Sequence, residues 1–563
     1  MVEKLVIVGG VAGGAGAATR ARRLDENVEI VLFERGQYVS FANCGLPFYL
    51  GGEIKEHDDL IVANPEFLIF RYDIDVRISC EVTKIDREKK EVEVKDLRNN
   101  KVYTESYDKL ILSPGAGPIR PPLEGIDLDT IFTIRSIPDI ERIKNLVDGK
   151  KPESAVVVGG GFIGLEMAEN LSARGVKVTI VEMLDQVMPP IDFDMAAIVH
   201  HHLRDKGVDL KLKDGVKSFR KDGEKTVVTT SGGSDIPCDL VVLSIGVKPE
   251  NKLAKDAGLE IGERGGIKVD ETLRTSDPDI FAVGDAIEVM DFVTRTPAQI
   301  PLAGPANRQG RIAAGNALGR NFTYKDTQGT AVVKVFDITV ASTGSSEKLL
   351  KKLNIPHKVS YTHSASHAGY YPGAGMMAIK LMFAPDDGKV FGAQIVGRSG
   401  VDKRIDVIAT AIRGGMTVYD LEDLELAYAP PYSSAKDPVN MAGFVAANLL
   451  RGDCENIYWN ELKELDREEY VLLDLREKNE IEETDHLEGS IHIPLNELRN
   501  KLLELDNSKT YIPYCAIGLR GYVACRILIQ NGFKAKNLSG GYRTYCFAEN
   551  EASGGSGMKC PKI

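Results

Sequence analysis

Two cysteines stand where their sulfur could do chemistry. Cys44 lies in the segment SFANCGLP over residues 40–47, and the nearest later cysteine is Cys80. A sulfur partner for Cys44 must therefore come from a distant residue, a bound small thiol or an oxidant. The attacking species is the thiolate, which a helix terminus or neighbouring cations favour by lowering the pKa of the thiol. The alternative is a buried and inert cysteine.

Cys515 opens the second such segment, CAIGLR over residues 515–520, between an expected strand at 510–514 and an expected helix. A strand-to-helix turn of this kind points backbone amides and a helix N-terminus at the sulfur, where they stabilise a thiolate or a persulfide anion. Arg520 follows Cys515 after four intervening residues, whereas cysteine phosphatases normally have a longer loop. We therefore expect a reactive sulfur anion at Cys515, with phosphatase chemistry and an inactive fold as the alternatives.

The residues that precede Cys44 predict a dinucleotide site. A short strand at 5–8 leads into a glycine turn at 9–14 and a helix to about residue 24, and a second strand at 29–33 ends at Glu34. Amides at the start of such a helix bind a pyrophosphate, and the acid binds ribose hydroxyls. Val11 replaces the usual second glycine of the fingerprint.

The same order recurs from residue 155, where GxGxxG is complete at Gly159, Gly161 and Gly164, and a strand at 177–181 ends at Glu182. An acid at this position accepts a hydrogen bond from the 2′-hydroxyl of NADH and repels the 2′-phosphate of NADPH. We therefore expect NADH, while Lys177 leaves the use of NADPH open.

Three further segments complete the order: strand-to-glycine crossings at 110–116 and 243–249, and a strand that ends in Gly284-Asp285, where a carboxylate can face a flavin ribityl chain. Together they resemble the flavin and nicotinamide disulfide oxidoreductases with two dinucleotide folds, over residues 1–447. The resemblance implies an α/β chain with two Rossmann-like domains, for FAD and NADH, and an α+β dimerisation domain. The implied cofactor-binding residues are Gly9, Gly10, Ala12, Gly13, Gly14, Glu34, Arg35, Ser113, Pro114, Gly115, Gly159, Gly161, Phe162, Ile163, Gly164, Glu182, Gly246, Gly284, Asp285 and Ala303.

Within that superfamily, the segments at 11–14, 20–23, 38–47 and 428–438 resemble coenzyme A disulfide reductase. In that family a single cysteine works beside the flavin and the counter-thiol belongs to CoA, which gives the redox role to Cys44. Arg20 and Arg23 share one helix face and can grip the phosphorylated adenosine end of CoA. A solvated basic helix face is the alternative. The resemblance also implies CoA contacts from Ser40, Asn43, Arg71, Asn307 and Lys436.

Tyr370 and Tyr428 match family tyrosines that reach the active site of the other subunit. Their hydroxyls would protonate or orient the leaving sulfur, and packing at a dimer interface is the alternative. The region that contains them resembles the interface domain of the superfamily, with strand-like stretches at 330–335, 340–343, 376–383 and 390–395. We therefore expect a homodimer.

The chain after residue 454 resembles a rhodanese domain over 455–549, an α/β fold in which Cys515 is catalytic and Ala516, Ile517, Gly518, Leu519 and Arg520 form the loop. Asp474, Arg476 and His486 are expected to make structural contacts there. The expected domains are FAD-binding at 1–115 and 245–324, NAD(P)H-binding at 116–244, dimerisation at 325–447, rhodanese at 455–549, and a flexible tail at 550–563. We expect Cys560 in this tail to be nonfunctional, with a swinging thiol as the alternative.

Composition narrows the remaining possibilities. A length of 563 residues with 43% hydrophobic residues supports several buried cores, and a formal net charge of −12 argues against a general nucleic-acid binder. The sequence has no uninterrupted apolar run of 18 residues and no signal-like start, so we expect a cytoplasmic protein without membrane contact. Eight scattered cysteines without CxxC pairs predict reduced thiols, with neither a disulfide framework nor a metal site.

The combined hypothesis is an NADH-dependent flavoprotein that reduces CoA persulfide, polysulfide or CoA disulfide, with small thiols and persulfides as its partners. Electrons from NADH would pass through FAD to a mixed disulfide between Cys44 and CoA, and Cys515 would carry sulfane sulfur. One alternative is a single-cysteine NADH oxidase or peroxidase that cycles through sulfenic acid. The other is a redox-sensing or sulfur-carrier protein, which sustained NADH turnover on a sulfur substrate would exclude.

Overall fold

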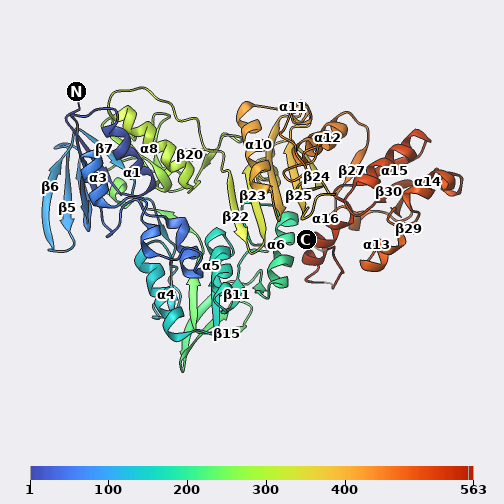
Figure 1. Ribbon diagram of the computed structural model, residues 1–563, viewed down its shortest axis with the longest axis horizontal. Helices are drawn as coiled ribbons and strands as arrows, with labels where there is room; N and C mark the ends of the chain where they lie inside the picture. The colour runs from blue at the N-terminus through green and yellow to red at the C-terminus, as the bar shows by residue number, and fades with distance from the viewer. Residues whose placement is uncertain (1, 556, 562–563) are drawn as a thin grey trace. The chain divides into compact units, whose positions relative to one another are not determined.

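Residues 2–555 and 557–561 are described by a computed structural model (Figure 1). The chain forms two compact units. The first unit runs to Met183 and resumes over 214–329, and the second comprises residues 184–213 and the chain from Thr330 onwards. The domain boundaries expected from the sequence stay a prediction.

The first unit begins with a parallel sheet in the order β3-β2-β1-β7-β19. Its strands are β1 (Lys4–Val8), β2 (Glu29–Glu34), β3 (Asp75–Ile78), β7 (Lys109–Leu112) and β19 (Ile280–Ala282). Leu5, Val6 and Ile7 are fully buried, which explains why β1 is a continuous apolar run. Helices α1 (Ala12–Arg22) and α8 (Ala303–Ala317) lie side by side, because a Cβ at Gly310 would be only 2.2 Å from the carbonyl oxygen of Gly13.

A second parallel sheet in the same unit places β11, β10, β16 and β9 side by side. The strands are β9 (Ile131–Phe132), β10 (Ser154–Val158), β11 (Lys177–Val181) and β16 (Leu240–Leu243), and α5 (Phe162–Ala173) follows β10. Both sheets have the strand, glycine turn and helix order expected from the sequence, so the two Rossmann-like folds are confirmed. Smaller elements of the unit include β4 (Cys80–Asp86), β5 (Glu91–Asp96), β6 (Lys101–Ser106), β13 (Val216–Asp222), β14 (Lys225–Thr230), β15 (Asp235–Cys238), α3 (Pro65–Tyr72) and α4 (Ile137–Lys150).

The second unit contains an antiparallel sheet in the order β22-β23-β26-β25-β24. Its strands are β22 (Ala331–Val335), β23 (Ile338–Gly344), β24 (Lys358–Ala365), β25 (Met376–Phe383) and β26 (Val390–Gly397), and its helices include α6 (Phe193–Asp205), α9 (Glu347–Lys352), α10 (Val401–Gly414), α11 (Val418–Asp423) and α12 (Pro438–Leu450). The ammonium of Lys380 is fully buried, and it lies 2.8 Å from Asp194 and 2.7 Å from Glu347. This mixed sheet-and-helix arrangement confirms the α+β fold expected for the region.

A parallel sheet forms the C-terminal part of the second unit, in the order β27-β31-β30-β28-β29. Its strands are β27 (Glu455–Ile457), β28 (Tyr470–Asp474), β29 (Ile491–His492), β30 (Thr510–Tyr514) and β31 (Lys534–Leu538), with helices α13 (Lys478–Glu483), α14 (Leu495–Lys501), α15 (Leu519–Gln530) and α16 (Gly541–Ala552). This is the separate α/β domain that the sequence predicts.

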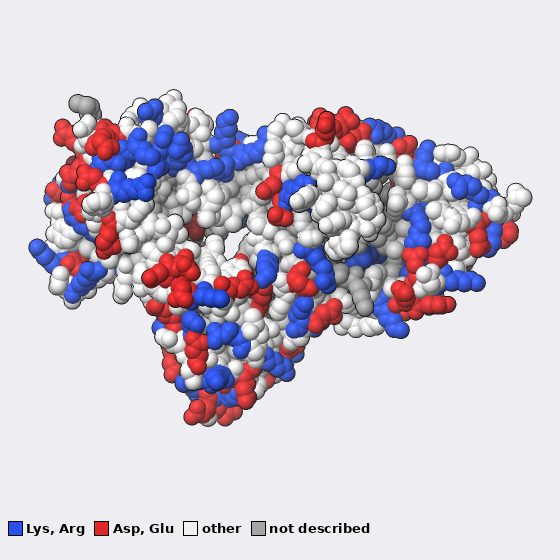
Figure 2. Space-filling view, viewed as in Figure 1, with Lys and Arg blue, Asp and Glu red and all other residues white. Residues whose placement is uncertain are grey.

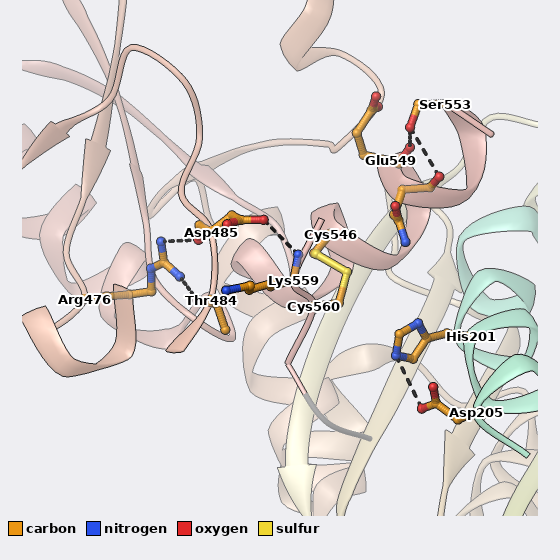
Figure 3. Close-up of a disulfide and its surroundings, with 11 residues drawn as sticks. His201, Asp205, Arg476, Thr484, Asp485, Cys546, Glu549, Ser553, Lys559 and Cys560 are labelled. Atoms are coloured by element: carbon orange, nitrogen blue, oxygen red, sulfur yellow. Dashed lines mark hydrogen bonds and ion pairs between the residues drawn. A yellow bond between two sulfur atoms is a disulfide. The ribbon is translucent and has the colours of Figure 1, made fainter. Parts of the chain in front are cut away.

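One prediction about the cysteines is wrong. Cys546 on α16 and Cys560 form a disulfide across 14 residues, whereas the sequence predicts reduced thiols (Figure 3). The chain returns toward α16 after its end, and the backbone amide of Lys559 donates to Asp485 at 2.8 Å, which brings the two cysteines together. Cys560 is therefore not an isolated tail thiol. The expected mobility of 550–563 stays a prediction: 550–552 belong to α16, and Ser556, Lys562 and Ile563 lie outside the described residues.

Candidate active site

The glycine turns of both Rossmann-like folds have the same tight geometry. Gly9 has φ +97° and Gly159 has φ +102°, and a Cβ there would lie 2.1 Å from the carbonyl oxygen of Ser113 and 2.5 Å from that of Ser244, respectively. Only glycine tolerates this combination of positive φ and close approach. Each turn therefore brings a helix N-terminus against the carboxyl ends of its strands, where free amides can receive a pyrophosphate.

An acid closes each turn in the same way. A carboxylate oxygen of Glu34 accepts a hydrogen bond from the amide of Gly10 at 2.8 Å, and one of Glu182 accepts from Gly160 at 2.7 Å. At Gly161, a Cβ would meet no described atom within 4 Å, so a side chain fits at this position of the turn. This open space explains why Val11, at the equivalent position of the first fold, does not disturb the turn. The residues present therefore fit FAD at the first fold and NADH at the second.

The third flavin-facing segment begins where β19 ends. Gly284 has φ +76° and its amide donates to the Gln309 side chain on α8 at 2.8 Å. Asp285 follows in a short 3-10 helix, η3 (Gly284–Ala286), and burial raises the pKa of its carboxyl, with Arg135 acting in the opposite direction. A carboxyl held in this way at the edge of the sheet can accept hydrogen bonds from ribityl hydroxyls.

The remaining cofactor residues expected from the sequence lie at the same strand ends and helix starts. Pro114 accepts a hydrogen bond from Arg135 at 3.0 Å, and Arg35 pairs with Glu250 at 3.0 Å. The others are Ala12, Gly13 and Gly14 at the start of α1, Ser113 and Gly115 after β7, Phe162, Ile163 and Gly164 at the start of α5, Gly246 after β16, and Ala303 at the start of α8. The contact of each residue with a cofactor stays a prediction.

Cys44 lies in the 3-10 helix η1 (Asn43–Gly45), directly before α2 (Leu46–Gly51). It is a free, solvent-accessible thiol, while the other cysteines of the first unit, Cys80 and Cys238, are buried. Partial burial raises the pKa of the Cys44 thiol, and the carboxylates of Glu166 and Asp285 raise it further. The charges that shift this pKa are those of carboxylates, so the chain itself disfavours the thiolate.

Glu166 is the functional candidate that the sequence reasoning missed. Burial, followed by the charge of Glu169, raises the pKa of Glu166 to about 7. It lies on α5, and α5 packs on α2 so closely that a Cβ at Gly51 would be 1.9 Å from the side-chain oxygen of Asn170, one turn beyond Glu166. A carboxyl that titrates near neutrality beside a thiol can exchange a proton with it. The sequence signal that could have identified Glu166 is its position, two residues after the last glycine of GxGxxG.

Six of the seven residues expected to bind CoA belong to the first unit, and one of these six, Asn43, is next to Cys44 in the sequence. The amide of Ser40 donates to the carbonyl oxygen of Gly10 at 2.8 Å, which ties the cysteine segment to the start of α1. Arg20 and Arg23 lie on and just after the last turn of α1, Asn307 lies on α8 and Arg71 on α3. Lys436 belongs to the second unit, so its meeting with the others stays a prediction.

Tyr370 and Tyr428 meet in the second unit. Their hydroxyl oxygens are 3.0 Å apart, and the side chains are 77% and 49% exposed, so the pair is available to another molecule. The hydrogen bond with Tyr428 raises the pKa of Tyr370. Exposure of two large aromatic side chains is consistent with the expected subunit interface.

A buried arginine holds the two tyrosine-bearing segments together. Arg404 on α10 donates to the carbonyl oxygen of Ser366 at 2.9 Å, to the Ser433 hydroxyl at 3.1 Å and to the Asp437 carboxylate at 2.9 Å. The amide of Ala368 also donates to the carbonyl oxygen of Ser433 at 3.0 Å. Arg404 therefore fixes the spacing of the segments from which Tyr370 and Tyr428 project.

The Cys515 loop has the geometry expected for a sulfur anion. The amide of Gly518 donates to the Cys515 sulfur at 3.2 Å, and α15 begins at Leu519. The backbone of α16 seals the other side, because a Cβ at Gly541 would lie 2.4 Å from the carbonyl oxygen of Cys515. The Arg520 guanidinium makes two hydrogen bonds with Glu480, at 2.6 and 2.7 Å.

The expected structural contacts of Asp474 and Arg476 are confirmed. The Arg476 guanidinium donates to Asp474 at 2.7 Å, and both side chains are buried. Arg476 also donates to Thr484 and to the carbonyl oxygen of Asp485, beside the tail disulfide (Figure 3).

Comparison with known proteins finds family matches in three parts of the chain. Residues 3–310 match the family model of the pyridine nucleotide-disulphide oxidoreductases, residues 330–438 match its dimerisation domain, and residues 459–547 match the rhodanese-like domain. Over 80% of its length, the chain is 36% identical to the coenzyme A disulfide reductase of Staphylococcus haemolyticus, all of which is covered.

Two solved structures resemble nearly the whole chain. The reduced Bacillus anthracis CoADR-RHD is 52% identical, with a TM-score of 0.95, over 97% of this chain and 98% of that one. An NAD-dependent persulfide reductase from A. fulgidus is 40% identical, with a TM-score of 0.90, over 96% and 99%. The water-forming NADH oxidase of Lactobacillus brevis is 29% identical, with a TM-score of 0.76, over 80% of this chain and 99% of that one. None of the helices in the described part of the chain is long and apolar enough to cross a membrane.

Proposed function

The chain belongs to the pyridine nucleotide-disulphide oxidoreductase family, and from this premise we propose that it is an NADH-dependent reductase of CoA persulfide, polysulfide or CoA disulfide. Its C-terminal rhodanese domain transfers sulfane sulfur. The observation that carries the proposal is Cys44, which is free and solvent-accessible in a unit whose other described cysteines are buried. A cysteine placed in this way can take the sulfur of a small molecule as its partner.

The chain's own residues can hold the cofactors. The turn at Gly9 with Glu34 and the carboxyl of Asp285 suit FAD, and the turn at Gly159 with Glu182 suits NADH. FAD held by these residues would supply the chemistry of accepting a hydride from NADH and passing two electrons to sulfur. The Glu182 carboxylate favours NADH, because it would repel the additional phosphate of NADPH.

The chemistry at Cys44 balances with CoA persulfide as the substrate. The Cys44 thiolate attacks the inner sulfur of CoA-S-SH, so a Cys44-S-S-CoA mixed disulfide forms and hydrosulfide leaves with the electron pair of the broken sulfur-sulfur bond. Two electrons and one proton then return the Cys44 thiolate and CoA thiol, while a second proton converts hydrosulfide to hydrogen sulfide. The sum is CoA-S-SH + NADH + H⁺ giving CoA-SH + H₂S + NAD⁺.

Glu166 and the tyrosine pair would handle the protons. With its pKa raised to about 7 by burial, Glu166 can take the proton from the Cys44 thiol. Tyr370 and Tyr428 would reach the mixed disulfide from the other subunit of a homodimer, where their hydroxyls protonate or orient the leaving sulfur. The matched dimerisation domain supports this assembly.

Cys515 would supply the substrate. A persulfide on Cys515 passes its outer sulfur to the CoA thiolate, which yields CoA-S-SH and the Cys515 thiolate, the anion toward which the amide of Gly518 points. This explains why a sulfur-transfer domain and a thiol-dependent reductase share one chain. The reduced thiols that this chemistry requires point to the cytoplasm.

The function can be tested with the purified protein. Denaturation should release FAD, identified by its mass, and NADH oxidation should be followed without oxygen on CoA persulfide, CoA disulfide and hydrogen peroxide. Cys515→Ser should spare turnover of the small CoA substrates and abolish the use of thiosulfate or polysulfide as a sulfur source. A preference for peroxide, with no CoA-dependent turnover, would instead support the single-cysteine oxidase or peroxidase.

A further inference from the structure

Helices α1 and α8 of the first unit form one continuous surface that leads away from the Cys44 segment. The Ser40 amide ties that segment to Gly10, just before α1. A Cβ at Gly16 on α1 would lie 3.3 Å from the side-chain oxygen of Asn307 on α8, so these residues stand opposite each other. A Cβ at Gly13 would lie 3.6 Å from the carbonyl oxygen of Ala306, and one at Gly310 would lie 3.2 Å from the amide nitrogen of Ala17, so the contacts advance along both helices in the same sense.

Four arginines gather where this surface ends. Arg20 is one turn beyond Gly16, and Arg311 is one turn beyond Asn307, so the two side chains stand at the same level on neighbouring helices. Arg23 follows α1 and Arg320 follows α8. Figure 2 shows Lys and Arg side chains concentrated over these helices.

The charges of the other three arginines act on Arg20. Burial lowers the pKa of Arg20, and the charges of Arg311, Arg23 and Arg320 lower it further. Across residues 2–555 and 557–561, none of these four guanidinium groups makes an ion pair with a carboxylate, and the buried Nε of Arg20 has no hydrogen-bond partner. An uncompensated cluster of this kind is stabilised when an anion binds to it.

The position of the cluster fits one end of CoA. Helix α1 begins at Ala12, directly after the glycine turn to which the Cys44 segment is tied. At a rise of about 1.5 Å per residue, Arg20 lies roughly 12 Å further along this helix. A thiol at Cys44 and a phosphorylated adenosine at the arginines therefore place the pantetheine arm along the intervening turns. The 3′-phosphate is a monoester that carries up to two charges, and a guanidinium binds such a group through two parallel hydrogen bonds.

We propose that Arg311 and Arg320 bind the 3′-phosphate of CoA and thereby select CoA over dephospho-CoA. Arg20 and Arg23, on and just after α1, then remain for the diphosphate. The proposal rests on the proposed function, because it takes CoA to be the thiol that Cys44 uses. It adds two residues that neither the motifs nor the resemblance implicates.

The test measures binding by the FAD-loaded, reduced protein with isothermal titration calorimetry. The ligands are CoA, dephospho-CoA and pantetheine, and the variants are Arg311→Ala, Arg320→Ala and their combination. The double variant should bind CoA at least about tenfold more weakly, while its affinities for dephospho-CoA and pantetheine change less than about twofold. Arg220→Ala is the matched control, because it removes one exposed arginine that already pairs with Asp235 at 2.8 Å, and it should bind all three ligands as the wild type does.

The outcomes separate the two levels of the argument. Equal weakening for CoA and dephospho-CoA, or no weakening, would overturn the assignment of Arg311 and Arg320 while leaving the proposed function intact. If the wild type binds no CoA and turns over no CoA substrate, the proposed function itself fails. Retention of the flavin absorbance spectrum in each variant shows that the fold around α1 and α8 is unchanged.

Discussion

Replacing Arg404 with methionine removes the guanidinium that joins the two tyrosine-bearing segments of the second unit. Arg404 is 1% exposed and Asp437 is 2% exposed, so the substitution removes the nearer cation of a buried carboxylate and leaves it only Lys403, at 3.7 Å. Removing one partner of a buried ion pair costs about 3–5 kcal/mol. Asp437 keeps the Ser433 hydroxyl at 2.6 Å and the amide of Val439 at 3.0 Å, which places the expected loss at the lower end, about 3 kcal/mol.

Trp459, the single tryptophan of the chain, allows this loss to be measured in the second unit alone. Its ring stacks on Phe193, so urea unfolding followed by its fluorescence reports on that unit. Arg451→Met is the matched control, because this exposed arginine pairs with Glu422 at the surface and should contribute less than about 1 kcal/mol. Because Tyr370 and Tyr428 lose their fixed spacing, we also expect Arg404→Met to lower kcat by at least about tenfold.

The pH dependence gives a second check on the same residue. Burial alone would raise the pKa of Asp437, but hydrogen bonds from Ser433 and Val439 and the charge of Arg404 outweigh it, so the pKa is lowered. A lowered carboxyl pKa contributes stability above its unfolded value, about 4, and that contribution is lost as the pH falls through the folded pKa. The difference between wild type and Arg404→Met should therefore be full at pH 7 and shrink in acid. A loss below 1 kcal/mol at pH 7, or one independent of pH, would refute the reasoning.

Three further predictions concern single side chains. Glu166→Gln should lower the pKa of Cys44, because it removes a carboxylate that disfavours the thiolate; the pH profile of iodoacetamide alkylation measures this, and an unchanged midpoint would contradict it. Cys560→Ser should reduce the free energy of unfolding by about 3 kcal/mol, since the disulfide closes a short loop, and non-reducing peptide mapping of the wild type should find the linked peptides. Glu480→Gln should lower the KM for thiosulfate by roughly threefold at low salt, because Arg520 is no longer neutralised, while turnover of CoA disulfide stays unchanged.

Local sequence was sufficient to predict the two dinucleotide turns. The glycines that must adopt positive φ, such as Gly9 and Gly159, lie next to the strands they follow, and the acids Glu34 and Glu182 come at the end of the next strand. The strands, the glycine turn, the helix and the acid of each dinucleotide turn are encoded within about thirty residues. The same holds for the Cys515 loop, whose strand, turn and helix are consecutive.

Features that depend on distant segments could not be predicted in the same way. Glu166 acts on Cys44 only because α5 packs against α2, so the upward shift of the Cys44 pKa could not be predicted from local sequence. The Cys546–Cys560 disulfide depends on the return of the chain after α16, which the small polar tail residues do not indicate. The spacing rules for cysteine frameworks do not determine which cysteines pair.

The most direct test of the account is the stoichiometry of NADH oxidation on CoA persulfide without oxygen. For the wild type we predict one hydrogen sulfide and one CoA formed per NADH consumed, and for Cys44→Ser we predict no NADH consumption with any sulfur substrate. A Cys44→Ser variant that reduces CoA persulfide at the wild-type rate would contradict the central role of this cysteine. The same contradiction would follow if the wild type consumed NADH on CoA persulfide without releasing hydrogen sulfide.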